Sequence, residues 1–117
     1  MKAQRRGRID HEIQRALAQI IAEEVKDPRL GFVTVTRCEI TSDMKQCKVF
    51  VSIIGDRHAA RQSMEALESA RRFLRGELGK HIELRHTPEL LFVEDRSTEK
   101  AIELSRTLDA AMHGKKE

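Results

Sequence analysis

The chain has 117 residues, of which 35% are charged and only 3% aromatic, with neither tryptophan nor tyrosine. This length is sufficient for one domain with a single two-layer core. The shortage of aromatic rings argues against modules that stack single-stranded bases. No apolar run approaches the roughly 18 residues of a membrane span, and the N-terminus lacks the apolar core of a secretory signal. We therefore expect a cytoplasmic protein with no membrane partner.

The net charge of +3 is concentrated in two stretches. The first eight residues hold Lys2, Arg5, Arg6 and Arg8 and no acid, so they contribute +4 and leave −1 for the rest of the chain. Residues 71–86 hold five arginines or lysines against two glutamates. Such clustering is typical of a surface that meets a polyanion, although either cluster alone is equally compatible with an ordinary solvated surface.

The first predicted element is a helix over residues 8–25, where apolar side chains recur at helical spacing. Asp27-Pro28 should end it, because the residue before a proline is pushed out of the α region. After a turn at residues 28–31, strands are expected over 32–40 and 46–54, joined by turn residues at 41–44 into a hairpin. The inward parity switches within the first strand, which predicts a β-bulge near Thr36-Arg37.

The two cysteines, Cys38 and Cys47, are too few for a disulfide framework or a four-ligand zinc site. A hairpin loop centred between Ser42 and Asp43 would place them opposite each other, facing the core. Two small buried thiols are favoured over a cross-strand disulfide or redox pair in a cytosolic chain.

A second helix should begin after Asp56, a suitable N-cap, with a stripe of small and apolar residues on one side. Gly76 and Gly79 interrupt the helical run, so a kink or helix-to-helix junction is expected between 70 and 80. Pro88 is best placed as the first residue of a third strand containing residues 90–93. A last helix should follow Asp95-Arg96-Ser97, with its stripe at Ala101, Leu104, Leu108, Ala111 and Met112. This order predicts an α+β sandwich with a three-stranded sheet and helices on one face.

Gly76-Glu77-Leu78-Gly79 matches the GxxG loop with which KH domains clamp nucleotides. A helix that tolerates two glycines is the favoured interpretation, because an acid and a leucine do not receive phosphates. Enzyme chemistry has little support. The five histidines are scattered, no nucleophile elbow or phosphate loop is present, and no metal site or cofactor is indicated.

Three groups of residues closely resemble the ribosome-binding factor A family, in order and with almost no change of spacing over residues 8–96. They are Asp27-Pro28-Arg29-Leu30; the hairpin Thr34-Val35-Thr36, Ser42-Asp43-Met44 and Cys47-Lys48-Val49-Phe50-Val51; and Phe73-Leu74-Arg75, Leu78-Gly79-Lys80, Leu84-Arg85, Pro88-Glu89-Leu90 and Phe92. The resemblance implies a type II KH-like fold and a protein that is not an enzyme. It also implies binding to the free 30S ribosomal subunit and assistance in late maturation of its 16S rRNA, including the 5′ end, with a role in cold adaptation.

One departure concerns the kink between the two central helices. Family members usually carry Ala-x-Gly there, whereas this chain has Ala70-Arg71-Arg72. Either the kink survives without the glycine or the bend moves toward Gly76. In both cases Arg72 adds positive charge on the expected RNA side.

From the resemblance and the charges we expect a basic arm at 1–7, a KH-like RNA-binding domain at 8–96, and a C-terminal helix and tail at 97–117. The protein should be a monomer that binds 30S subunits and 16S rRNA and not mature 70S ribosomes. Phosphate contacts would supply affinity and orientation.

Alternatives are a generic single-stranded RNA module or a protein-interaction adaptor. For Arg29 and Arg85, an ion pair with a nearby acid such as Asp27 or Glu89 is equally plausible. The candidate RNA-binding residues are Lys2, Arg5, Arg6, Arg8, Arg29, Arg71, Arg72, Arg75, Lys80 and Arg85.

Overall fold

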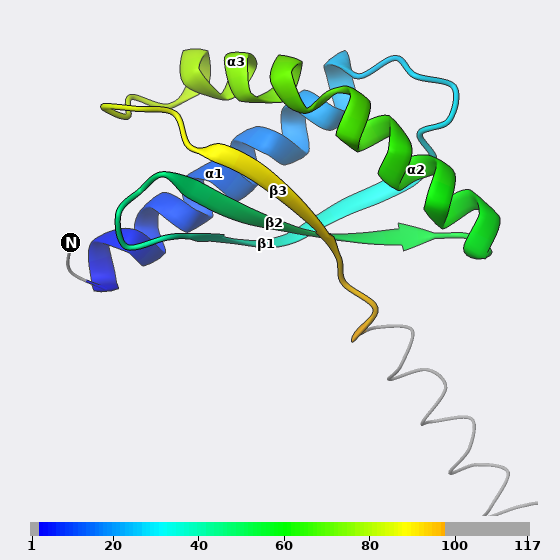
Figure 1. The fold of residues 1–117 in the computed structure, drawn as a ribbon, viewed down its shortest axis with the longest axis horizontal. Coiled ribbons are helices and arrows are strands. Elements are labelled where there is room, and N and C mark those ends of the chain that lie inside the picture. Colours follow the sequence, from blue (N-terminus) through cyan, green and yellow to red (C-terminus); the bar gives the residue numbers. More distant parts are fainter. Residues whose placement is uncertain (1–2, 98–117) are drawn as a thin grey trace, which may run out of the picture.

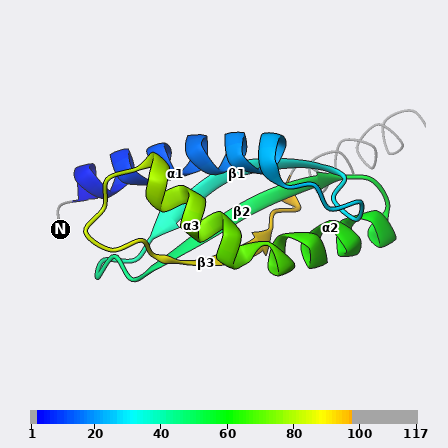
Figure 2. The ribbon, with the colours of Figure 1, turned by 90° about the horizontal axis from the view of Figure 1, so that it is seen from above.

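The computed structural model describes residues 3–97, which form a three-stranded sheet with helices on one side (Figure 1). The elements follow the order α1, β1, β2, α2, α3, β3, and the strands lie in the order β1-β2-β3. The predicted α+β sandwich is therefore confirmed. Viewed from above, α1 runs along β1, and α2 and α3 cover the rest of the sheet (Figure 2).

Helix α1 spans Ala3–Glu24 and supplies much of the core. It begins at Ala3 and not at Arg8, so residues 3–7 continue the helix where a separate basic arm was predicted. Good helix formers in this stretch outweigh the cost of about 1 kcal/mol for a helical glycine. Asp10 accepts a hydrogen bond from the Ile40 backbone N–H at 2.7 Å, which ties the start of α1 to the sheet. The helix ends before Asp27-Pro28, as predicted.

The hairpin has the predicted bounds, with β1 at Phe32–Ile40 and β2 at Gln46–Ile54. The antiparallel register shifts between Val35 and Arg37, which confirms the bulge. The predicted pairing of the cysteines is wrong by two residues. Ile40 faces Cys47, because the Thr41 N–H donates to the Gln46 carbonyl and centres the loop one residue later.

Both cysteines are free and buried, as favoured from the sequence. A hydrogen bond with Cys47 and burial raise the pKa of Cys38, so it stays a neutral thiol.

Helices α2, Arg57–Ser69, and α3, Arg71–His81, meet at a single residue. Asp56 caps α2 by accepting from the Ala59 N–H at 2.8 Å, as predicted. The break lies at Ala70, whose φ of −88° and ψ of 0° do not require a glycine. The kink therefore survives without a glycine, and α3 runs uninterrupted past Gly76.

Strand β3, Glu89–Glu94, is parallel to β2 and contains the predicted residues 90–93. Pro88 is fully buried immediately before it. The predicted C-terminal helix lies outside the described residues. None of the helices between Ala3 and His81 is long and apolar enough to cross a membrane.

Candidate nucleic-acid interface

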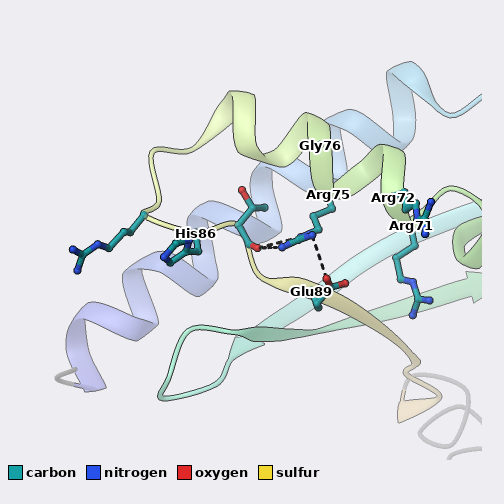
Figure 3. A pocket seen from close by; sticks show the side chains of 8 residues that line it. Arg71, Arg72, Arg75, Gly76, His86 and Glu89 are labelled. Carbon is teal, nitrogen blue, oxygen red and sulfur yellow. Dashed lines mark hydrogen bonds and ion pairs between the residues drawn. The ribbon is translucent and has the colours of Figure 1, made fainter.

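A cleft of about 760 Å³ opens between the first turns of α3 and the segment that leads into β3 (Figure 3). Four of its lining residues are arginines and one is an acid. We call it the basic cleft, and it is lined by Arg71, Arg72, Arg75, Gly76, Arg85, His86, Thr87 and Glu89. Four of the ten predicted RNA-binding residues therefore meet in one concave surface.

The position of the cleft follows from the amphipathic pattern of α3. Leu74 and Leu78 are fully buried against the core, which turns Arg72 toward solvent on the other side of α3. Arg71 is exposed in the first turn of the helix, and Arg75 is half-buried beside the leucines. On the opposite wall, buried Pro88 fixes the entry to β3. Residues 85–87 lead into β3 along this wall, and Arg85 lines the cleft together with the arginines of α3.

Arg75 lies in the middle of the basic cleft and holds its two walls together (Figure 3). Its Nε and Nη2 atoms donate to the Thr87 carbonyl at 3.1 and 2.7 Å. Its Nη1 atom lies 3.2 Å from the Glu89 carboxylate. The Arg75 guanidinium is thus occupied by contacts within the protein. Its main contribution to the cleft is to position the wall that carries Arg85 and His86.

Arg72 and Arg85 differ from Arg75, because neither has an ion-pair partner among the residues that the structure describes. Both are exposed. Arg71 is intermediate, with its Nη1 atom 3.5 Å from Glu68 one helical turn earlier. An exposed pair of this kind is worth little and is easily exchanged for another anion. The basic cleft therefore offers Arg71, Arg72 and Arg85 to a ligand with several negative charges.

The GxxG sequence lies within α3 and not in a loop between helices, which rules out the clamp geometry of a KH loop here. The two glycines have different surroundings. A Cβ atom on Gly76 would meet nothing within 4 Å, whereas one on Gly79 would lie 2.9 Å from Thr87 Oγ1. Gly79 therefore permits the close approach of α3 to residue 87.

Arg29 lies outside the basic cleft and makes the ion pair that was weighed against RNA binding. Its Nη2 atom is 2.7 Å from Asp27 and also donates to Ser69 at 3.0 Å. Hydrogen bonds from the Arg29 side chain and backbone lower the pKa of Asp27 to about 2. This pair fastens the turn after α1 to the end of α2. Lys80 likewise contacts Glu77 at 3.1 Å and does not line the cleft.

The N-terminal candidates are only partly placed. Lys2 lies outside the described residues, and Arg5 belongs to α1 by its backbone. Arg6 lies beside Asp10 and Glu39 in a smaller hollow, and Arg8 is exposed. Neither Arg6 nor Arg8 lines the basic cleft.

Besides Gly76, which the sequence offered only as part of the GxxG motif, three lining residues were not among the predicted RNA-binding residues: His86, Thr87 and Glu89. Their signal in the sequence is their position on either side of Pro88, which fixes the entry to β3. Among residues 3–97, no group of three His, Cys, Asp or Glu side chains is arranged to hold a metal ion.

Comparison with known proteins places the chain in a family. Residues 5–108 match the family model described as ribosome-binding factor A. The chain belongs to the ribosome-binding factor A family. The family member of Heliobacterium modesticaldum is 44% identical over 92% of this chain and 89% of its own.

A crystal structure and a fitted homology model of ribosome-binding factor A share the fold. The crystal structure of the Thermus thermophilus factor matches with a TM-score of 0.71 and 27% identity, over 79% of this chain and 97% of that one. A homology model of the Thermus thermophilus factor, fitted into a cryo-EM map of a 30S complex, matches with a TM-score of 0.65 and 28% identity, over 78% of this chain and 96% of that one. The KH-like fold is consistent with these matches.

Proposed function

We propose that this protein binds the free 30S ribosomal subunit by placing folded 16S rRNA against the basic cleft. The observation that carries the proposal is the convergence of four arginines on a concave surface that contains one acid. Phosphate oxygens would contact Arg72, Arg85 and, after it leaves Glu68, Arg71. Because phosphate contacts carry no base information, the choice of site would come from RNA shape. The family membership and the fitted 30S complex of the Thermus thermophilus factor support this partner.

The protein would act without catalysis. By binding one arrangement of a ribosomal RNA element more tightly than another, it would shift that equilibrium by its differential affinity alone. We infer that this assists late maturation of 16S rRNA, including its 5′ end, and matters most in the cold, where misfolded RNA escapes slowly. The factor would be a cytoplasmic monomer that leaves before the 70S ribosome forms.

Sedimentation with purified 30S subunits tests the interface. We expect Arg72→Glu combined with Arg85→Glu to weaken binding on the order of 100-fold, which is roughly tenfold for each charge reversed. Arg61→Glu is the matched control, because Arg61 is an exposed arginine of α2 outside the basic cleft. Unchanged sedimentation of the double variant at 150 mM salt, about physiological ionic strength, would reject the cleft as the RNA-binding surface.

The single-stranded RNA alternative makes a different prediction. It requires tight binding to short unstructured oligonucleotides, whereas a shape-reading cleft binds them weakly and with a steep salt dependence. The helical position of the GxxG sequence favours the ribosomal function.

A further inference from the structure

The chain has four phenylalanines and neither tryptophan nor tyrosine. Phe92 is buried, and the ring of Phe50 already lies under the Arg37 guanidinium. Phe32 and Phe73 are the exposed ones, at 79% and 46%. Of these two, only Phe73 adjoins the basic cleft, because it follows Arg72 directly on α3. An aromatic ring beside cations is the combination with which proteins hold nucleotides.

Phe73 lines a second hollow, of about 290 Å³, where the end of α1 meets the break between α2 and α3. We call it the junction hollow, and it is lined by Glu24, Val25, Lys26, Asp27, Ser69, Ala70 and Phe73. This volume lies at the lower end of the range for small-molecule sites. The junction hollow is therefore suited to one flat ring system and not to a helix or a strand of a partner.

The charges of the junction hollow balance, in contrast to those of the basic cleft. Asp27 is paired with Arg29 at 2.7 Å. Lys26 and Glu24 are both exposed and carry opposite charges. The remaining side chains that line the hollow are small or apolar. A site without net charge and with an aromatic wall suits an uncharged ring, because a phosphate gains little electrostatic energy there.

The junction hollow and the basic cleft lie on adjacent sides of the first turn of α3. Successive residues of an α-helix point about 100° apart, so Arg72 lines the cleft while Phe73 lines the hollow. A nucleotide has both of the chemistries that these two sides accept, since its phosphate is charged and its base is flat and uncharged. An RNA strand with a phosphate at Arg72 can therefore turn a neighbouring base onto Phe73.

We propose that Phe73 stacks one unpaired base of the ribosomal RNA in the junction hollow, while the phosphates next to that base contact Arg71 and Arg72. This inference rests on the proposed function and names the RNA feature that the protein takes, a bulged or looped-out nucleotide within folded RNA. Such a nucleotide leaves the face of its base open to an aromatic ring. One ring holds one base, so the scarcity of aromatic residues that argues against a single-stranded RNA module is compatible with this site.

Sedimentation of ring variants with purified 30S subunits tests the stacking. Phe73→Leu keeps an apolar side chain but removes the ring, and it should weaken binding about tenfold. Phe73→Trp should bind as tightly as the unaltered chain, because an indole ring also stacks on bases. A purely structural role predicts the opposite order, since leucine is accommodated in a packed site more easily than the larger tryptophan. Phe32→Leu is the matched control and should bind normally, because Phe32 is exposed and lines neither hollow.

Ultraviolet crosslinking of the complex with 30S subunits identifies what Phe73 touches. Irradiation should join Phe73 to one nucleotide of 16S rRNA, which mass spectrometry of the peptide containing residue 73 detects. The crosslink should be lost in Phe73→Leu and retained in Phe32→Leu.

Three results overturn the proposal. Full binding by Phe73→Leu, while Arg72→Glu combined with Arg85→Glu fails to bind, would remove the stacked base and leave the basic cleft as the RNA surface. A crosslink from residue 73 to a ribosomal protein would assign the junction hollow to a protein partner. Full binding by the arginine double variant would remove the proposed function and this inference together.

Discussion

The basic cleft and the side of the sheet away from the helices belong to one small domain, but they differ in whether their arginines have partners within the protein. In the cleft, Arg72 and Arg85 have no ion-pair partner within residues 3–97. On the side of the sheet away from the helices, Arg37 stacks over the Phe50 ring at 4.0 Å and pairs with Glu39 at 3.4 Å. Cations without partners in a concave surface suit a polyanion, whereas apolar side chains beside neutralised charges suit an apolar partner.

The largest effect should separate the two sides of strand β3. Leu90 points into the core and is fully buried, whereas Leu91 lies on the uncovered side. Leu90→Ala should lower the free energy of unfolding by about 2–5 kcal/mol, through lost burial and a cavity. Leu91→Ala should cost less than about 1 kcal/mol. Urea denaturation measures both, and equal losses would mean that the uncovered side is as well packed as the core.

The next effect concerns the role of Arg75 in the basic cleft. Arg75→Lys keeps the charge but loses the pair of hydrogen bonds that the Nε and Nη2 atoms donate to the Thr87 carbonyl. We expect a loss of about 1 kcal/mol in stability and roughly tenfold weaker 30S binding, because the wall carrying Arg85 moves. Thermal denaturation and sedimentation check these values. Full binding by the lysine variant would show that Arg75 supplies only charge.

The two glycines of α3 test how closely the helix approaches residue 87 in the same wall of the cleft. Gly76→Ala should stabilise by up to about 1 kcal/mol, since its Cβ meets open space. Gly79→Ala should not give this stabilisation, because its Cβ would lie only 2.9 Å from the Thr87 Oγ1 atom. Thr87→Ala should restore it in the double variant, and a double-mutant cycle of denaturation curves measures the coupling. Zero coupling would contradict the close approach.

The smallest effect lies outside both surfaces, at Asp27. Its pKa is lowered to about 2 in the folded state from an ordinary 3.8, so deprotonation favours folding. The stability that it contributes is complete above about pH 4 and is lost as the pH falls toward 2. Denaturation midpoints between pH 2 and 5, compared with Asp27→Asn, measure this contribution. The variant should show a shallower decline.

Most of the fold could be predicted because the signals are local. The bounds of both hairpin strands, the bulge at Thr36-Arg37 and the Asp56 cap each follow from side-chain parity or hydrogen bonding within a few residues. The early start of α1 was missed, because residues 4–7 carry no apolar side chains to extend the stripe. The cysteine register was missed because one hydrogen bond in the turn decides it.

The residue types of the candidate site could be predicted from the sequence, but the role of each arginine could not. Clustering identified the arginines of residues 71–86, but their roles depend on which carbonyl or carboxylate each one meets. Arg75 reaches the carbonyl of a residue twelve positions later, and Arg29 turns to Asp27 and away from the cleft. No periodicity within a helix contains that information.

By itself, the sequence determined the element order, the family and the sign of the charge at the junction of α2 and α3. Helical and strand periodicities and proline sterics act over a few residues, so they can be read without coordinates. Only the tertiary structure decided which cations remain available to a ligand. That outcome depends on how α3 and the start of β3 pack around Leu74 and Pro88, because burial of those side chains sets the distance between the walls of the cleft.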